Sequence, residues 1–330
     1  MKAISLVSGG LDGTLAAKLI QDQGVDVIPI HFRIPFCHNK ENESAGILAN
    51  TMPLLGIDVR MVELGEEFLD LIRRPRHGFG SHMNPCIDCK ILMLSKAREM
   101  MVEYNANFVV TGEVVGQRPM SQHKQALLTI AKRAGLEGLV VRPLSARLLP
   151  ETIPEREGWL NREALLDLNG RGRKAQLALA KQFSVHDYPQ PAGGCLLTDP
   201  NFARRLKDVV EDGVFDLDDV ALLKIGRHFR LGRHAKLVVG RNERENQQLE
   251  RVVKPGDSLF APQLVAGPTA LGRGVFDDRL DELSMRIVAA YCDVPPGVLA
   301  QIALGSTGQA DVVRADIVPL PESELTALRL

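Results

Sequence analysis

The 330-residue chain has no apolar run long enough to cross a bilayer, and it does not begin with the charged and then apolar segment of a secretory signal. We therefore expect a cytoplasmic protein that has no membrane partner. The chain also lacks an excess of charge of one sign, because 40 Lys and Arg residues stand against 41 Asp and Glu residues. Any affinity for nucleic acid must then come from local patches.

Cysteine is scarce as well, with five residues in the whole chain. So few cysteines in a chain of this length argue against a disulfide framework, and they favour a metal-binding, redox or sulfur-carrying role for some of them. We find no internal repeat and no low-complexity segment. With 45% hydrophobic and 25% charged residues, the composition is that of a globular protein with room for two domains.

Strand-like and helix-like segments alternate over the first 142 residues. Strands separated by helices predict an α/β fold built on a doubly wound parallel sheet. Ligands of such sheets bind at the carboxyl ends of the strands, so the residues after the first and fourth strands are expected to face one crevice. The predicted strands are 2–7, 25–32, 56–64, 106–111 and 138–142, and the predicted helices are 15–23, 40–54, 89–104 and 121–134.

The rest of the chain follows a different pattern. Prolines punctuate the stretch up to residue 200, which we interpret as an extension over the active face of a first domain, 1–200. Residues 201–223 are predicted to be a helical linker. Residues 224–330 are predicted to form a second, smaller α+β domain with its tail, because alternating strand-like segments there are mixed with helical ones at 242–252 and 277–291.

A glycine-rich turn follows the first strand. Residues 8–14 read SGGLDGT and lead directly into a helical pattern. Glycines let backbone N–H groups approach anionic oxygens, and the dipole of the helix favours negative charge, so this turn is a candidate phosphate-binding site. The Gly-Lys-Ser/Thr of a Walker motif is absent. An ordinary strand-to-helix turn is the alternative interpretation.

Three cysteines form the second candidate site. Cys86 and Cys89 make a Cys-x-x-Cys pair where a helix begins, a place at which the helix dipole stabilises thiolates. Cys195 follows Gly193 and Gly194, which provide an adaptable backbone. Three cysteines can bind three irons of a cubane cluster, or one can carry a persulfide that another resolves. The alternative is a buried pair without chemistry.

The other two cysteines have no partner at ligand spacing. Cys37 and Cys292 are therefore expected to be structural. Cys37 comes just after the second predicted strand, which places it near the crevice and keeps it as a secondary candidate.

The first 200 residues resemble a known family. Residues 110–117 (VTGEVVGQ), together with Ser121-Gln122 and 142–144 (RPL), are similar to the catalytic domain of the tRNA 4-thiouridine synthases, which are PP-loop ATP pyrophosphatases of HUP-like fold. The resemblance implies an enzyme that replaces a uridine carbonyl oxygen by sulfur through an adenylated uridine. The family usually has serine at the position of Gly13, so that a phosphate-binding hydroxyl is missing here and ATP turnover is in doubt.

The resemblance also implies which residues bind ATP and Mg²⁺. Asp12 is expected to hold or orient Mg²⁺ and so to take part in catalysis, with a helix N-cap as its alternative role. Backbone near His31 and Phe32 is expected to meet the adenine. The full set expected to bind the nucleotide is Ser8, Gly9, Gly10, Asp12, Gly13, Thr14, His31, Phe32, Thr111, Gly112 and Gln117.

The cysteine pattern separates two versions of the sulfur chemistry. Cys86, Cys89 and Cys195 resemble the set of those family members thought to use an iron–sulfur cluster, here of the [4Fe–4S] type. Related tRNA thiolases have two cysteines, at positions like Cys89 and Cys195, and use a persulfide instead. Three cysteines where two suffice favour the cluster.

Residues 225–275 resemble the RNA-binding domain of the NFACT type. The similarity runs from 226–230 (GRHFR) to 239–242 (VGRN), and basic residues gather there. Such a patch can neutralise phosphates, although a solvated surface is the alternative. Because this chain begins at its first strand, we expect the basic domain to replace the RNA-binding module that precedes the catalytic domain in bacterial members. The expected RNA contacts are Arg118, Arg171, Arg173, Lys174, Arg227, Arg230, Arg233, Lys236 and Arg241.

The expected partners are tRNA and a sulfur donor, either a cysteine desulfurase or sulfide. A homodimer is compatible with the sequence. Three other functions stay open: thiolation at the 2-position of uridine, a PP-loop reaction on a small molecule, and RNA binding with a degenerate ATP site, which the glycine at position 13 suggests.

Overall fold

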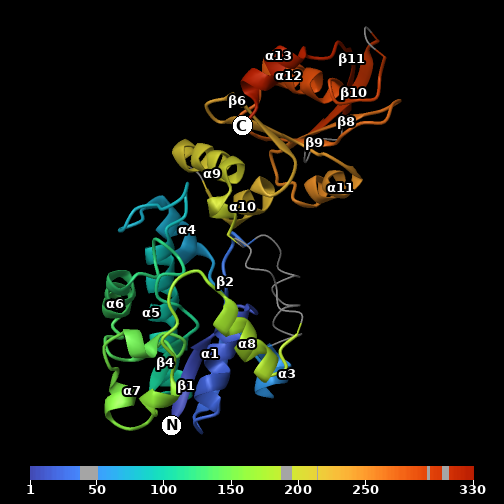
Figure 1. Cartoon of the computed structure of the whole chain (residues 1–330). Coiled ribbons are helices and arrows are strands. Elements are labelled where there is room, and N and C mark those ends of the chain that lie inside the picture. Colours follow the sequence, from blue (N-terminus) through green and yellow to red (C-terminus); the bar gives the residue numbers. More distant parts are fainter. Residues whose placement is uncertain (38–50, 187–194, 214, 296–297, 307–311) are drawn as a thin grey trace. The chain divides into compact units, whose positions relative to one another are not determined.

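A computed structural model of the chain describes residues 1–37, 51–186, 195–213, 215–295, 298–306 and 312–330 (Figure 1). The chain divides into two compact units, Met1–Thr198 and Asp199–Leu330. Most of the predicted helix at 40–54, and the glycines at 193 and 194, lie outside the described residues. No helix in the described part of the chain combines the length and the apolar character needed to cross a membrane.

The first unit is built on a five-stranded sheet in the order β3-β2-β1-β4-β5. All four strand pairings are parallel, which confirms the predicted parallel α/β fold. The strand that precedes the glycine-rich turn is therefore central, between β2 and β4. The strands are β1 (Lys2–Leu6), β2 (Asp26–Arg33), β3 (Arg60–Glu63), β4 (Phe108–Thr111) and β5 (Val140–Val141).

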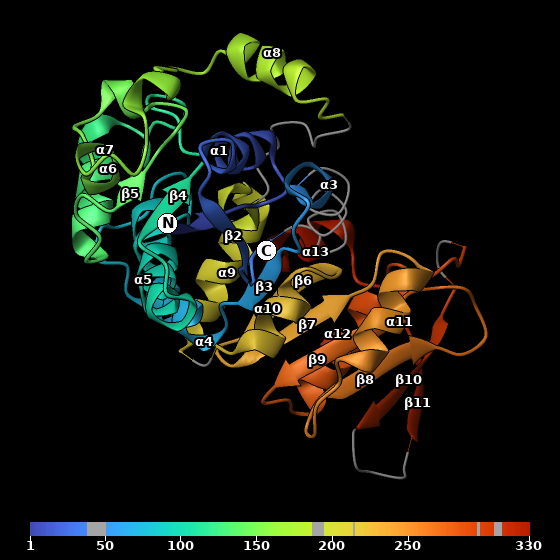
Figure 2. The same cartoon turned by 90° about the horizontal axis from the view of Figure 1, so that it is seen from below.

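Helices cover both faces of this sheet. Helix α1 packs on β1, β2 and β4, and α5 contacts β1 and β4; the two helices lie on opposite faces of the sheet in Figures 1 and 2. Ala3, Val27 and Phe108 form one buried cluster with Leu15 and Ile20 of α1. The helices are α1 (Leu11–Gln21), α3 (Met52–Leu55), α4 (Glu66–Arg73), α5 (Cys86–Tyr104), α6 (Lys124–Arg133), α7 (Ile153–Arg156) and α8 (Lys174–Gln182).

Helix α4 was not predicted from the sequence. Its apolar residues Phe68, Leu69 and Ile72 are buried, at the spacing of one helix face, and two glutamates occupy its first turn. That signal is short, because α4 has eight residues, and this explains why periodicity alone missed it.

The proline-rich stretch after β5 belongs to the first unit. Asn169 pairs with Val115 in an isolated parallel bridge, and the Gly170 amide donates to the Val115 carbonyl at 2.7 Å. The stretch therefore contacts the segment that follows β4. It contains three 3-10 turns besides α7 and α8: η2 (Ala146–Leu148), η3 (Arg162–Ala164) and η4 (Leu196–Thr198).

The second unit is a six-stranded antiparallel sheet in the order β11-β10-β8-β9-β7-β6. Alternate residues of β7 face two cores: Leu237 and Val239 pack with Ile287, whereas Val238 packs with Leu249. The predicted second α+β domain is confirmed. Its strands are β6 (Arg227–Gly232), β7 (Ala235–Val239), β8 (Ser258–Pro262), β9 (Ala270–Gly274), β10 (Ala300–Ser306) and β11 (Val312–Ile317).

The stretch interpreted as a helical linker, 201–223, lies within the second unit. It forms two helices, each begun by an aspartate whose carboxylate accepts backbone N–H groups, Asp199 and Asp216. Helix α13 was not predicted. The helices of this unit are α9 (Pro200–Asp212), α10 (Leu217–Leu223), α11 (Glu243–Arg251), α12 (Asp278–Ala289) and α13 (Glu322–Leu328).

Candidate active site

The glycine-rich turn has the backbone that anion binding requires. Gly9 adopts φ of +72°, a conformation that side chains disfavour, and Gly10 is the N-cap of α1 without a side chain to cover the helix end. Ser8 is exposed at the turn. The amide groups of the first helical turn are thus left without a side-chain cap, where an anion can accept from them.

Asp12 occupies the first turn of α1 and lacks a full set of hydrogen bonds. Gln117 Nε2 donates to Asp12 Oδ2 at 2.9 Å, while Asp12 Oδ1 is buried without any hydrogen-bond partner. A buried carboxylate oxygen with an open position fits Mg²⁺, which proteins often hold by one or two carboxylates plus phosphate oxygens of the substrate. The alternative role as an N-cap belongs to Gly10 instead.

Gly112 brings the end of β4 into contact with this turn. A Cβ atom on Gly112 would lie 2.6 Å from the Asp12 carbonyl oxygen and still closer to the Gly13 amide nitrogen, so only glycine permits this approach. At Gly13 itself a Cβ would meet the Leu6 carbonyl oxygen and Val7 Cα at 3.4 Å, which is an ordinary contact. The structure thus has room at position 13 for the serine that the family resemblance leads us to expect there.

Three residues predicted to contact the nucleotide, Thr14, His31 and Phe32, have buried side chains. The Thr14 hydroxyl donates to the Gly10 carbonyl at 3.2 Å and lies 2.8 Å from the Thr51 hydroxyl, so it does not replace the missing serine hydroxyl. His31 Nδ1 lies 2.9 Å from the Val7 carbonyl oxygen. Both His31 and Phe32 are buried at the end of β2, where only their backbone can meet a ligand.

A buried ionic network joins β4 to the cysteine-bearing helix. Glu113 Oε2 accepts from Thr111 Oγ1 and from Arg142 Nε, each at 3.0 Å, and Lys90 Nζ lies 3.8 Å from Glu113 Oε1. Burial would raise the pKa of Glu113, but Lys90 and Arg142 outweigh it and lower this pKa below its ordinary value. Glu113 is therefore a fixed anion that holds Lys90 next to Cys89.

The three candidate cysteines lie near one another. Cys86 and Cys89 open α5, and both Cys86 and Cys195 interact electrostatically with the Cys89 sulfur. The predicted low-pKa thiolate is wrong for Cys89: burial raises the pKa of its thiol to about 12, and Lys90 only partly offsets this. The helix dipole does not overcome the loss of solvent around this sulfur.

The expected iron–sulfur ligand set is not assembled in the described residues. There, no group of three or more His, Cys, Asp or Glu side chains is placed to hold a metal ion. The Cys86 thiol instead donates to Asn84 Oδ1 at 3.1 Å. The cluster that the cysteine pattern implies therefore stays a prediction, because a cubane cluster needs converging thiolates.

Two features of this site were not predicted from the sequence. Lys90, adjacent to Cys89, links the thiols to Glu113. Gln176 of α8 is 1% exposed, and neither atom of its amide has a hydrogen-bond partner. Its only sequence signal is a polar residue four positions before the buried Ala180, on a helix that packs on α1.

The basic residues expected to bind RNA in the first unit lie on two loops and the start of α8. Arg118, Arg171 and Lys174 are exposed or half-exposed, as such a role requires. Arg173 is half-buried at the N-cap of α8, and its Nε atom has no hydrogen-bond partner.

In the second unit, two of the residues predicted to bind RNA are engaged by carboxylates. Arg230 binds Asp208 and Asp212 of α9, and Lys236 is buried against Asp219 at 3.3 Å. An ion pair inside the domain already neutralises each side chain, so RNA would have to compete with these carboxylates, and RNA binding by the two residues stays a prediction. Sequence proximity did not reveal these partners, which come from the two helices before the sheet.

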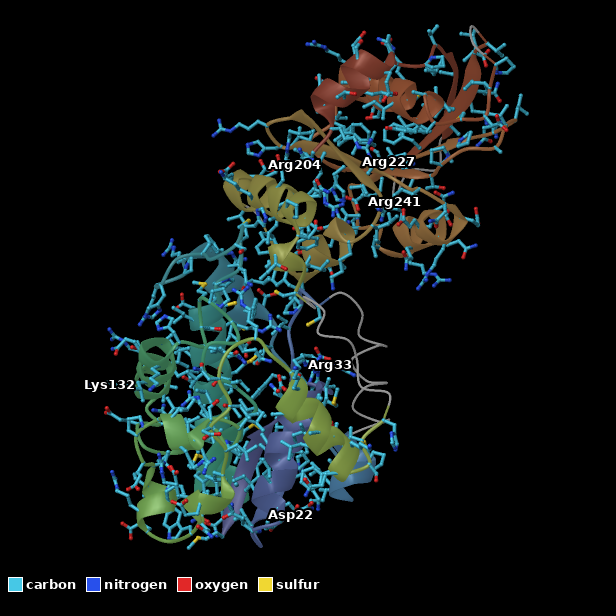
Figure 3. All side chains as sticks on the ribbon, in the orientation of Figure 1. Asp22, Arg33, Lys132, Arg204, Arg227 and Arg241 are labelled. Atoms are coloured by element: carbon cyan, nitrogen blue, oxygen red, sulfur yellow. The ribbon has the colours of Figure 1, made fainter. Side chains whose placement is uncertain are left out.

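Other cations of this unit are less well neutralised. Arg205 Nη1 donates to the Gly226 carbonyl at 3.5 Å, and its Nε atom is buried without a partner. Burial lowers the pKa of Arg205, and the neighbouring Arg241 and Arg204 lower it further, against the opposing effect of Asp199 and Glu245. Figure 3 labels Arg204, Arg227 and Arg241 on this unit.

Arg227, Arg233 and Arg241 are engaged to different degrees, and Arg241 donates to the Glu245 carboxylate from both Nε and Nη2. Arg227 donates to the Gly240 carbonyl at 3.0 Å and lies over the Tyr291 ring, and Arg241 pairs with Glu245 while 47% of its side chain stays exposed. Arg233 is exposed. We call Arg204, Arg205, Arg227 and Arg241 the arginine cluster.

Two family models match consecutive parts of the chain. Residues 1–147 match the family described as thiamine biosynthesis protein (ThiI), and residues 226–329 match the NFACT protein RNA binding domain. The predicted resemblance, a thiouridine synthase-type domain followed by an NFACT-type domain, is confirmed.

Curated relatives carry two different names. A probable tRNA sulfurtransferase of Thermococcus kodakarensis is 26% identical over 145 residues, which are 43% of this chain and 36% of that protein. A tRNA-specific 2-thiouridylase MnmA of Petrotoga mobilis is 21% identical over 300 residues, 80% of this chain and 78% of that protein. The chain thus spans about a third of the length of the first relative.

A solved structure described as a 4-thiouridine synthetase–RNA complex with bound ATP is also similar. It is 21% identical and covers 68% of this chain and 52% of that chain, with a TM-score of 0.38. That score is too low to support an argument about the fold.

Proposed function

We propose that this chain, in which a ThiI-type domain precedes an NFACT-type RNA-binding domain, is an ATP-dependent tRNA sulfurtransferase. It converts a uridine of tRNA to thiouridine, and 4-thiouridine is the proposed product. ATP adenylates the uridine oxygen, pyrophosphate leaves, and a sulfur nucleophile then displaces AMP from the ring.

One observation carries this proposal: a chain of contacts connects the phosphate-binding turn to the thiols. Gly112 packs on Asp12 and Gly13, Glu113 follows it in the chain, and Glu113 pairs with Lys90 beside Cys89. An enzyme that activates a base with ATP and then delivers sulfur needs both sites within reach of one base. A PP-loop reaction without sulfur needs no such connection.

The residues divide the work between the two steps. The amide groups at Gly9, Gly10 and the start of α1 would hold the phosphates, and Asp12, oriented by Gln117, would hold the Mg²⁺ that neutralises them. Mg²⁺ supplies charge stabilisation at the phosphates when it is bound. The target base must leave its stack to reach the thiols.

The thiols are proposed to deliver sulfur as a persulfide, and a cluster on Cys86, Cys89 and Cys195 is the alternative. Cys195 is the proposed carrier, since the Cys89 thiol, with its pKa near 12, stays protonated at neutral pH. The donor is a protein persulfide such as a cysteine desulfurase supplies. Sulfide, the other donor expected from the sequence, would attack the adenylated ring carbon directly, because it cannot form a persulfide on a thiol without an oxidant. Iron and acid-labile sulfide measured on anaerobic protein test this choice, and a cluster bound in proportion to protein would contradict it.

The arginine cluster is proposed to bind tRNA phosphates, with Arg118, Arg171, Arg173, Lys174 and Arg233 as further contacts. Phosphate would supply counter-charge to Arg205, whose pKa its arginine neighbours lower. Arg204→Gln with Arg205→Gln should lower the slope of log affinity against log salt by about 0.9 for each phosphate that the variant no longer neutralises. Lys207→Gln, an exposed change on the same helix, is the matched control. An unchanged slope in the double variant would remove the cluster from the interface.

The decisive experiment is nucleoside analysis of tRNA from cells with and without the protein. Loss of 4-thiouridine supports the proposal. Loss of 2-thiouridine would instead assign the reaction to the 2-position of uridine, in line with the relative named tRNA-specific 2-thiouridylase. Unchanged tRNA would reject the function. Nucleotide binding without tRNA-dependent pyrophosphate release would instead favour an RNA-binding protein with a degenerate ATP site. Activity and binding that do not depend on tRNA would favour a small-molecule substrate.

A further inference from the structure

Cys37 lies opposite Cys195, although the two are far apart in the sequence. They form an isolated antiparallel bridge, and the Leu196 amide donates to the Phe36 carbonyl at 2.9 Å. In an antiparallel pair, two opposite residues that exchange no backbone hydrogen bond with each other are flanked by residues that do. The bond from Leu196 to Phe36 therefore makes Cys37 and Cys195 a non-hydrogen-bonded pair. In such a pair the Cα atoms are about 4.5 Å apart and the side chains are closer than in the other type.

That register suits a disulfide. Disulfides join residues whose Cα atoms are about 4.4–6.8 Å apart, and a non-hydrogen-bonded pair falls within this range without any backbone movement. All four cysteines of the first unit, Cys37, Cys86, Cys89 and Cys195, are half-buried, so burial does not prevent a reaction at Cys37 or Cys195.

The bridge is held from both sides by buried structure. Phe36 is fully buried, and its ring centroid lies 5.6 Å from that of Phe68 in α4. On the other side, the Met83 amide donates to the Leu197 carbonyl at 3.2 Å, which ties the bridge to the segment just before Cys86. Cys195 is therefore held opposite Cys37 by the bridge and also interacts electrostatically with Cys89.

We propose that Cys37 and Cys195 are a redox pair, in which Cys37 resolves Cys195 after sulfur transfer by forming a disulfide with it. The role of the pair in sulfur transfer rests on the proposed function, whereas the closeness of the two cysteines comes from the structure alone. It gives a role to the cysteine that the sequence kept only as a secondary candidate. Cys89 is the other neighbour of Cys195, but its thiol lies in a setting that disfavours the nucleophilic thiolate.

The step balances without an outside oxidant. The outer sulfur of a Cys195 persulfide bonds to the activated ring carbon, and AMP leaves with the electron pair of the broken C–O bond. The Cys37 thiolate, whose proton goes to solvent, then attacks the inner sulfur, and the S–S bond to the outer sulfur breaks. The outer sulfur gains two electrons and leaves on the uridine, while the two cysteine sulfurs lose two electrons as their disulfide. A dithiol reductant restores both thiols.

Peptide mapping tests the pair without ATP or tRNA. Trypsin places Cys37 in residues 34–40, Cys86 and Cys89 together in residues 77–90, and Cys195 in residues 182–204. The full chain is treated with the thiol oxidant diamide, alkylated and digested. We expect peptides 34–40 and 182–204 to be linked. Linkage of 77–90 to 182–204 in their place, or no linkage at all, overturns the proposal.

Cys37→Ser and Cys292→Ser are the matched variants. Cys37→Ser should lose the linked peptides, whereas Cys292→Ser, a change in the second unit, should keep them. Circular dichroism of both variants checks that each is folded. If Cys37→Ser instead links 182–204 to 77–90, in the yield at which the wild type links 182–204 to 34–40, Cys37 is dispensable.

A single-turnover experiment tests the role in the reaction. Protein loaded from a small-molecule persulfide and given ATP and tRNA without reductant should make one thiouridine per protein and acquire the disulfide. Cys37→Ser should release pyrophosphate at the normal rate but keep the tRNA covalently attached until dithiothreitol is added. Normal product release from Cys37→Ser would overturn the resolving role. A wild-type protein that forms the disulfide with diamide but never thiolates tRNA would reject the proposed function and leave the pair intact.

Discussion

Lys90 Nζ lies 3.8 Å from Glu113 Oε1, and this ion pair joins the helix that begins with the Cys-x-x-Cys motif to the strand end that touches the glycine-rich turn of residues 8–14. The pair is half-exposed on the lysine side and buried on the glutamate side. Burial raises the pKa of the neighbouring Cys89 thiol, and the positive charge of Lys90 is the effect that lowers it.

The reactivity of Cys89 should therefore be low and should depend on pH. Because burial raises its thiol pKa to about 12, only about one molecule in 10,000 carries the thiolate at pH 8, and alkylation by iodoacetamide should rise about tenfold per pH unit up to pH 10. Lys90→Met removes the cation that lowers this pKa and should slow the reaction further. Mass spectrometry of the peptide that carries Cys89 measures the rate. Rapid labelling of Cys89 at pH 7 would show that its thiol pKa is not raised by burial.

Gly112→Ala should disrupt the ATP site. The added methyl group would lie 2.6 Å from the Asp12 carbonyl oxygen, so the first turn of α1 or the end of β4 must shift. We expect ATP affinity and pyrophosphate release to fall while the second unit stays folded. Gly305→Ala, where an added Cβ meets nothing within 4 Å, serves as the control. ATP affinity that is equal in both variants would show that the turn does not depend on this contact.

Gly13→Ser should improve the same site. A Cβ fits there at ordinary contact distances, and serine is the better helix former by about 0.5 kcal/mol. The added hydroxyl should raise ATP affinity and the rate of pyrophosphate release. Gly13→Ala separates the effects, because it gains helix propensity without a hydroxyl. If the serine variant binds ATP no better than the alanine variant, the hydroxyl plays no part in this protein.

Gln176→Met should stabilise the first unit and impair its function. Both polar atoms of this buried amide lack partners, and such groups cost about 1–3 kcal/mol of folding free energy. Methionine fills the same space without that cost. Denaturant unfolding should show the gain, while the KM for ATP or tRNA should rise if the amide meets a ligand. Lys181→Met, an exposed change on the same helix, should alter neither.

The second unit should lose stability in mild acid because of His228. Burial, assisted by Arg205 and Lys236, lowers the pKa of this imidazole from 6.5 to about 3. Below pH 6.5 the unfolded chain binds a proton that the folded chain does not, so stability is complete above pH 6.5 and is lost as the pH falls toward 3, by about 1.4 kcal/mol per pH unit from this group.

His228→Gln should flatten that pH dependence. Urea unfolding of the full chain at pH 7, 6, 5 and 4 measures it. His234→Gln, which changes an exposed histidine of the same unit, should keep the wild-type slope. An identical slope in His228→Gln would assign the acid sensitivity to other groups.

Much of the fold followed from local patterns. The alternation of strands and helices predicted the parallel sheet, and the position of residues 8–14 predicted a turn at the carboxyl end of its first strand, which the structure places at the centre of the sheet. Periodicity succeeded there because the central strands are buried. It failed at α4 and α13, which have eight and seven residues, because so few turns give too few apolar positions to detect.

The sequence by itself determined which candidate groups the chain carries, a glycine-rich turn and a set of thiols, because backbone freedom at Gly9 and the residue type cysteine are local properties. Only the tertiary structure decided which charges and thiols are available. Arg230 and Lys236 are basic in any fold, but their carboxylate partners come from helices earlier in the chain. The Cys89 pKa and the pairing of Cys37 with Cys195 likewise depend on segments brought together by folding, since burial and cross-strand register are not properties of a residue and its neighbours in sequence.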